Sequence, residues 1–169
     1  MPTKEAVHGQ QAPAYLFLGV KMTIHLSGAQ TGGGFSLIEA EMPASGDGGL
    51  HAHTREDESV YLLEGELTVT IADQTFSLKA GECYFVPRNT PHRFRNTSDT
   101  VARAILINTP GTFDELVRRG GVPFEEPRAT CELPDSPDIQ KLLSLATEFG
   151  VQILAPPTRD EHHGADGNV

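Results

Sequence analysis

Two histidines and three acidic residues lie close together in the stretch LHAHTREDESVYLLEGE. One residue separates His51 from His53, and Glu56, Asp57 and Glu58 follow shortly after them. In a β-strand, residues two positions apart project to the same face, so both imidazole rings can point to one spot. Imidazole nitrogen is the commonest metal ligand, and a carboxylate beyond a turn can supply an oxygen. The spacing therefore indicates a metal site to which one of the three carboxylates contributes.

A fourth ligand must come from another part of the chain, and His92 in the stretch PRNTPHRF is the candidate. It follows a proline-containing turn and begins a predicted strand, about forty residues after the histidine pair. That separation can return an antiparallel chain beside its starting strand. A site with three histidines and one carboxylate leaves open positions for water, oxygen or substrate, which suits catalysis. The alternative is a polar strand face next to a solvated acidic turn, without a metal.

The composition indicates a single domain rich in β-structure. A chain of 169 residues suits one hydrophobic core, and 17 glycines and 12 prolines favour short strands joined by turns. The net charge of −10 argues against nucleic acid and membrane surfaces as partners. Cys83 and Cys131 lack metal-motif spacing and are interpreted as reduced thiols. Because the sequence also has no long apolar run, a cytoplasmic protein is expected.

Periodic hydrophobic residues predict the elements that must position these side chains. One strand is expected over residues 15–27, and others over 35–42 and 101–108. Short β-favouring runs separated by turns continue from the acidic cluster to residue 96, which is the pattern of a meander or Greek-key barrel.

Two short helices and an edge strand are predicted near the C-terminus. The stretch TFDELVRRGG begins with Thr112 as N-cap and ends at Gly120 and Gly121; SPDIQKLLSLATEFG has Ser136 as N-cap. The stretch VQILAPP then predicts an edge strand. The chain is accordingly divided into a flexible N-terminal arm (1–13), a barrel (14–110), a helical extension packed on the barrel (111–157) and a disordered tail (158–169).

The stretch from His51 to Gly65 has the spacing of a known family motif. It reads His-x-His, four residues, Glu58, six residues and Gly65. This pattern resembles the first motif of the cupin family. That motif usually opens with a glycine at the position held here by Ser45. Gly46 comes one residue late, so the preceding loop is expected to be one residue shorter.

A second stretch, from Gly81 to Asn96, resembles the second cupin motif. It reads Gly81, five residues, Pro87, one residue, Asn89, two residues, His92, three residues and Asn96. Asn89 stands where glycine is usual, and asparagine also tolerates a left-handed backbone. The resemblance covers roughly residues 35–110. It implies an all-β fold, namely a single cupin barrel (a double-stranded β-helix or jelly roll) with short C-terminal helices.

The resemblance also implies which residues hold a metal. By position in the motifs, the ligands are His51, His53, Glu58 and His92, which leaves Glu56 and Asp57 as neighbours that face solvent. The set suits one divalent transition metal ion, which can be iron, manganese, cobalt, nickel, copper or zinc.

The C-terminal sequence further resembles cupins grouped with quercetin 2,3-dioxygenases, through the stretches NTPGTFDELV and EFGVQILAPP. This resemblance implies a metal-dependent dioxygenase that cleaves a flavonol such as quercetin, or a related aromatic or enolic small molecule, with O₂. Glu58 would then be both a ligand and the general base. The alternatives are a metal-dependent isomerase, cyclase or decarboxylase of a small natural-product-like substrate, and a non-enzymatic small-molecule-binding cupin.

Strand parity predicts an apolar substrate pocket beside the ligands. Phe94 shares a face with His92, while Val60 and Leu62 share one with Glu58. Further candidates are Met42, Ile38, Phe85 and Ile107. Residues of this parity also form the packed core of a barrel, which is the alternative interpretation. The edge strands and helices around the barrel lead us to expect a homodimer.

Overall fold

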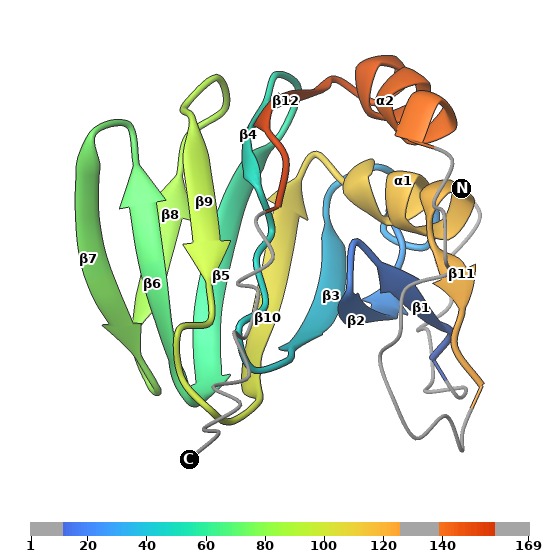
Figure 1. The fold of residues 1–169 in the computed structure, drawn as a ribbon. Helices are drawn as coiled ribbons and strands as arrows, with labels where there is room; N and C mark the ends of the chain where they lie inside the picture. Colours follow the sequence, from blue (N-terminus) through green and yellow to red (C-terminus); the bar gives the residue numbers. More distant parts are fainter. Residues whose placement is uncertain (1–11, 126–138, 158–169) are drawn as a thin grey trace, which may run out of the picture.

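Two antiparallel β-sheets pack around a shared core in the computed structural model, which describes residues 12–125 and 139–157 (Figure 1). The first sheet has the strand order β11-β1-β2-β3-β10-β5-β8, and the second has the order β12-β4-β9-β6-β7. The strands are β1 (Ala14–Phe17), β2 (Val20–Leu26), β3 (Ser36–Met42), β4 (Leu50–His53), β5 (Asp57–Glu64), β6 (Glu66–Ile71), β7 (Gln74–Lys79), β8 (Cys83–Val86), β9 (His92–Arg95), β10 (Ala102–Thr109), β11 (Val122–Pro123) and β12 (Val151–Ala155). Two short helices accompany them, α1 (Phe113–Gly120) and α2 (Ile139–Glu148). The predicted all-β jelly-roll class with short C-terminal helices is confirmed.

The core lies between the sheets because side chains alternate along the central strands and most of the inward ones are apolar. β3 and β10 pair with Ile38 opposite Leu106, and burial alternates along both strands. From the second sheet, Leu67 and Val69 of β6 join the same cluster. This alternation also decides which side chains of β5 and β10 can reach an interior site.

The alternation predicted from Val20 onward is that of β2, but residues 15–27 do not form one strand, because the chain turns back at Leu18 and Gly19. β1 and β2 form a hairpin in which Phe17 pairs with Val20. Both turn residues have left-handed backbone conformations, with φ of 52° at Leu18 and 84° at Gly19. A two-residue hairpin loop requires this geometry, and leucine seldom adopts it, so the sequence signal for the turn is weak.

The segment after the barrel strands returns to both sheets. Helix α1 contacts β1 and β3, α2 contacts β12 and α1, and β12 pairs with β4 as the predicted edge strand (Figure 1). Thr112 occupies the N-cap of α1, as predicted, but its side chain makes no capping hydrogen bond. The predicted N-cap Ser136, most of the predicted arm and the predicted tail lie outside the described residues.

Among the described residues, Cys83 is a free, exposed thiol; Cys131 lies outside them. No helix in the described part of the chain is both long and apolar enough to cross a membrane.

Asn96, the last residue of the second motif, joins two loops at one end of the barrel. Its buried side-chain amide donates hydrogen bonds to the carbonyl oxygens of Met42 and Pro43, each at 3.0 Å, and of Thr100 at 2.7 Å. Its side-chain oxygen accepts from the backbone N–H of Ser98 at 3.1 Å. Asn96 therefore satisfies backbone groups of both the β3–β4 and β9–β10 loops. We assign it a role in stability rather than in the metal centre.

The substitution Asn96→Ala is expected to lower the free energy of unfolding by about 2–3 kcal/mol, because buried carbonyl oxygens lose their donors. Urea unfolding followed by circular dichroism measures the change. The control Asp99→Ala alters an exposed residue of the same loop and is expected to change stability by less than about 0.5 kcal/mol. Equal losses in the two variants would contradict the assignment.

Candidate metal centre

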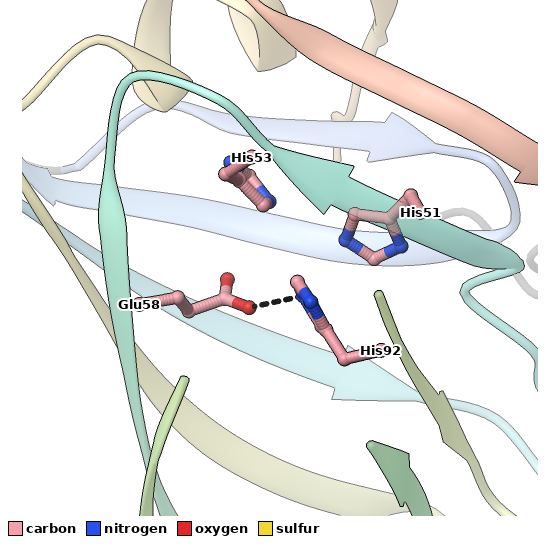
Figure 2. Close-up of side chains that lie close together, drawn as sticks. All are labelled: His51, His53, Glu58 and His92. Carbon is pink, nitrogen blue, oxygen red and sulfur yellow. Dashed lines mark hydrogen bonds and ion pairs between the residues drawn. The ribbon is translucent and has the colours of Figure 1, made fainter. Parts of the chain in front are cut away.

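Three histidines and one glutamate from both sheets converge on one point in the interior (Figure 2). His51 and His53 come from β4, His92 from β9 and Glu58 from β5. His51 pairs directly with His92 across β4 and β9, and these two rings are 4.3 Å apart between centroids. One ligand atom of each of the four residues lies within 4.8 Å of the others. The structure thus brings together all four ligands that the cupin resemblance implies.

Left-handed backbone conformations shape the loops around this cluster. Asn89 has a φ of 65°, the conformation expected for a residue in the place of a motif glycine, and its N–H donates to the carbonyl of His53 at 2.7 Å. Ser45 has a φ of 58°. Ser45 itself therefore adopts the conformation that the motif glycine would favour, whereas Gly46 is not among the residues with positive φ.

The three imidazole rings are oriented alike, because the Nδ1 atom of each faces a hydrogen-bond acceptor. The acceptors are the carbonyl of Gly49 for His51 (3.0 Å), a carboxylate oxygen of Glu56 for His53 (3.1 Å) and the carbonyl of Thr90 for His92 (2.9 Å). With Nδ1 as donor, Nε2 of each ring is directed to the cluster. Nε2 of His53 is buried and has no hydrogen-bond partner. A nitrogen lone pair left unsatisfied inside a protein fits a metal ligand.

Glu58 and His92 form a buried ion pair, with 3.0 Å between Oε2 and Nε2. Burial opposes the carboxylate, but the hydrogen bond to His92 and the charges of the three histidines hold the pKa of Glu58 well below its usual range. Burial also opposes the imidazolium, yet the hydrogen bond and charge of Glu58 raise the pKa of His92. In the metal-free cluster, the two shifts favour a proton on His92 and a negative charge on Glu58.

His51 responds in the opposite direction. Burial, together with the positive charges of His92 and His53, lowers the pKa of His51 to about 3. Its Nε2 consequently keeps a free lone pair at neutral pH. In the absence of metal, the pKa values of these two neighbouring imidazoles are thus shifted in opposite directions.

Glu56 does not face solvent, and that prediction is wrong. Its side chain is 1% exposed and accepts hydrogen bonds from His53 and from the first residues of α1. Asp57 is half-buried and pairs with Arg88 at 2.8 Å, which lowers the pKa of Asp57 to about 2. The position of Glu56 could not be predicted from local spacing, because the residues that bury it come from a distant helix.

A cavity of about 90 Å³ adjoins the cluster and is almost entirely apolar. His51 and Glu58 form its polar corner. Of the predicted pocket residues, Val60, Phe94 and Met42 line it. The sequence did not single out Phe113 of α1 and Leu106 of β10, which also line it.

Four predicted pocket residues lie elsewhere. Ile38 and Leu62 are fully buried, but they pack in the core and do not line the cavity. Phe85 is 57% exposed, because Val86 is the inward residue of β8, paired with Glu58. Ile107 pairs with Ser59 on the outer face, opposite in parity to Leu106.

Asn108 is a further residue of the site that sequence reasoning missed. Its side chain is fully buried near the C-terminal end of β10, where Asn108 pairs with Glu58 of β5. The Asn108 amide donates a hydrogen bond to Oε1 of Glu58 at 3.3 Å. The alternation of side chains along residues 102–108 could have placed Asn108 on the inward face. Nothing in the neighbouring sequence indicates that this asparagine contacts a metal ligand.

Comparison with known proteins agrees with the fold. Residues 38–108 match the family model described as Cupin domain. A crystal structure of an RmlC-like cupin from Shewanella frigidimarina has a TM-score of 0.55 at 22% identity, over 64% of this chain and 93% of that one. At that identity, the likeness concerns the fold.

Sequence relatives have different roles. Quercetin 2,3-dioxygenase of Bacillus subtilis is 28% identical over 126 residues, which are 75% of this chain and 37% of that protein. The HTH-type transcriptional regulator PuuR of Escherichia coli is 36% identical over 77 residues, 46% of this chain and 41% of the regulator. This chain thus spans less than half the length of either relative. The two sheets, the matched segment and the clustered motif residues together show that residues 38–108 form a cupin domain.

Proposed function

We propose that this protein is a metal-dependent dioxygenase of a small aromatic or enolic molecule. One observation carries the proposal: three imidazole rings and the Glu58 carboxylate converge on one point, and two of these groups, His51 and Glu58, line an apolar cavity. A divalent transition metal fits this donor set, which combines imidazole nitrogens with one carboxylate and leaves positions open for substrate and O₂. The similarity to quercetin 2,3-dioxygenase supports this reaction type.

A bound divalent metal would supply a positive charge for an ionised enol or phenol oxygen and a place for O₂ to react. Glu58 would accept the proton of the substrate hydroxyl. In the metal-free cluster, the hydrogen bond and charge of His92 help to hold the pKa of Glu58 low. Asn108 holds the other oxygen of this carboxylate.

The cavity favours a substrate with one polar anchor. Val60, Phe94, Leu106 and Phe113 offer no charge to bind a phosphate or a second carboxylate, and they keep water from the reacting atoms. Its volume of about 90 Å³ is small beside the roughly 300–1,000 Å³ of pockets for drug-sized ligands. A compact single-ring enol or phenol therefore fits better than a flavonol, which requires the walls to move apart.

A non-enzymatic sensor is the second candidate, since part of the transcriptional regulator PuuR is similar to this chain. A metal-dependent isomerase, cyclase or decarboxylase would use the same ligands without consuming oxygen. Oxygen consumption that keeps pace with substrate loss separates the dioxygenase from both.

Oxygen uptake tests the proposal directly. Samples loaded separately with iron, manganese, cobalt, nickel or copper are given quercetin or single-ring enols, and uptake is compared with substrate loss. We expect matched uptake from at least one metal form and none from His92→Ala, which loses a ligand and binds little metal. If fully loaded protein consumes no oxygen with any of these compounds, the dioxygenase proposal fails.

Glu58→Gln tests the role of the base. We expect this variant to keep substantial metal and to lose turnover by roughly 100-fold or more, because an amide cannot take up the substrate proton. Metal content is measured alongside turnover. Full activity in a metal-loaded Glu58→Gln protein would remove the general base from the mechanism.

Metal affinity is expected to rise with pH. His92 must release its proton before Nε2 can bind a metal, and its raised pKa extends this competition above pH 6.5. As the pH is raised toward the pKa of His92, the apparent Kd for Co²⁺ should fall by up to about tenfold per pH unit. Above that pKa, the apparent Kd should become constant. Calorimetry in two buffers of different ionisation enthalpy counts the released proton.

The control for this pH dependence is His25→Gln, which changes an exposed histidine bound to Glu39 on the outer face. Its pH slope should equal that of the unaltered protein. A Kd that stays constant across the same pH range, with no proton released, would show that His92 is neutral in the metal-free protein.

A further inference from the structure

Glu56 is buried between the end of β4 and the start of α1, and it is not one of the four clustered ligands. One of its oxygens lies 3.1 Å from Nδ1 of His53. The other oxygen lies 2.6 Å from the backbone nitrogens of both Thr112 and Phe113, and 2.7 Å from the Thr112 hydroxyl. A single carboxylate thus connects a candidate metal ligand to a helix 56 positions away in the chain.

The contact with His53 determines which ring nitrogen carries the proton. A carboxylate only accepts hydrogen bonds, so Nδ1 of His53 must be the donor. The lone pair of the neutral ring is then on Nε2, the atom that faces the cluster and has no hydrogen-bond partner. Metal binding requires this tautomer, which Glu56 therefore stabilises before any metal arrives.

The contacts with α1 fix a wall of the cavity. The N–H groups of Thr112 and Phe113 begin the helix and would otherwise be unpaired, and the positive end of the helix dipole favours a carboxylate there. The Thr112 hydroxyl also donates to Glu56, which explains why it does not cap its own helix. The Phe113 ring packs edge-on against His53, with 5.1 Å between centroids, and lines the cavity.

We propose that Glu56 is a positioning residue that sets the tautomer of His53 and holds Phe113 against that ring. Through it, the metal ligand and the α1 wall of the cavity share one anchor. The functional importance of this inference rests on the proposed metal centre. The tautomer of His53 and the hydrogen bonds from Glu56 to α1 are properties of the metal-free protein.

Glutamine at position 56 separates this role from simple helix capping. Its carbonyl oxygen can still accept from the N–H groups of α1, while its amide presents a donor to Nδ1 of His53. The proton of His53 would then move to Nε2, which blocks that atom as a ligand. A residue that only caps the helix would leave both the tautomer and the metal affinity unchanged in this variant.

The first experiment observes the side chain of His53 by ¹H–¹⁵N NMR in the metal-free, full-length protein at about pH 8, above the ordinary imidazole pKa. We expect the proton on Nδ1 in the unaltered protein and on Nε2 in Glu56→Gln. A proton on Nε2 in the unaltered protein would overturn the proposal, and this result does not depend on whether the variant folds.

The second experiment measures Co²⁺ affinity by titration. Glu56→Gln is expected to weaken binding by roughly 10- to 100-fold, the usual effect of losing the partner of a ligating histidine. Two controls accompany it. Asp57→Asn makes the same change of charge one residue away, at a side chain bound to Arg88, and Thr112→Ala removes one donor to Glu56 while leaving His53 untouched. Both should bind Co²⁺ within about twofold of the unaltered protein.

The outcomes separate this inference from the proposed function. Unchanged Co²⁺ affinity in a folded Glu56→Gln protein, or an equal loss in Asp57→Asn, would overturn the role of Glu56. Absence of oxygen uptake by the metal-loaded, unaltered protein, with the expected tautomer and affinities, would remove the dioxygenase and leave the role of Glu56 intact.

Discussion

In the second sheet, β4 and β9 pair in the register that sets His51 opposite His92, and the whole centre depends on this pairing. Side chains alternate between the faces of a strand, so a slip of one residue would send His92 to the outer face and bring a neighbour inward. Glu58 belongs to β5 in the other sheet. It meets the histidines only because both sheets close over one apolar core, so packing far from the ligands maintains the distances between them.

Burying so many ionisable groups in one place requires each to have a partner. Glu58 is matched by His92 and Asn108, and Glu56 by His53 and the N-terminus of α1. The apolar walls strengthen these interactions because they exclude screening water. The same surroundings shift the pKa values of His51 and His92 in opposite directions, although both rings lie at the same centre.

The cupin barrel accommodates many reactions, so the site must supply the argument for function. Here the interior has one polar corner and otherwise apolar walls, which favours a molecule held by a single oxygen. Helix α1 contributes one of those walls and is joined to His53 through Glu56. A change in the shape of the cavity on that side is therefore physically connected to the geometry of a ligand.

The sequence by itself determined the β-rich fold class, and its resemblance to the two cupin motifs implied the turn conformation of Asn89 and the set of four residues that cluster. These features depend on short-range rules: the period of two along a strand, the backbone tolerance of asparagine and the spacing within two motifs. Other features were decided only by tertiary structure. The burial of Glu56 depends on the first residues of helix α1, which lie 56 positions away in the chain. The exposure of Phe85 depends on which face of β8 packs against the core. Long-range packing selects such contacts, because only the closed barrel determines which distant donors and apolar surfaces a side chain meets.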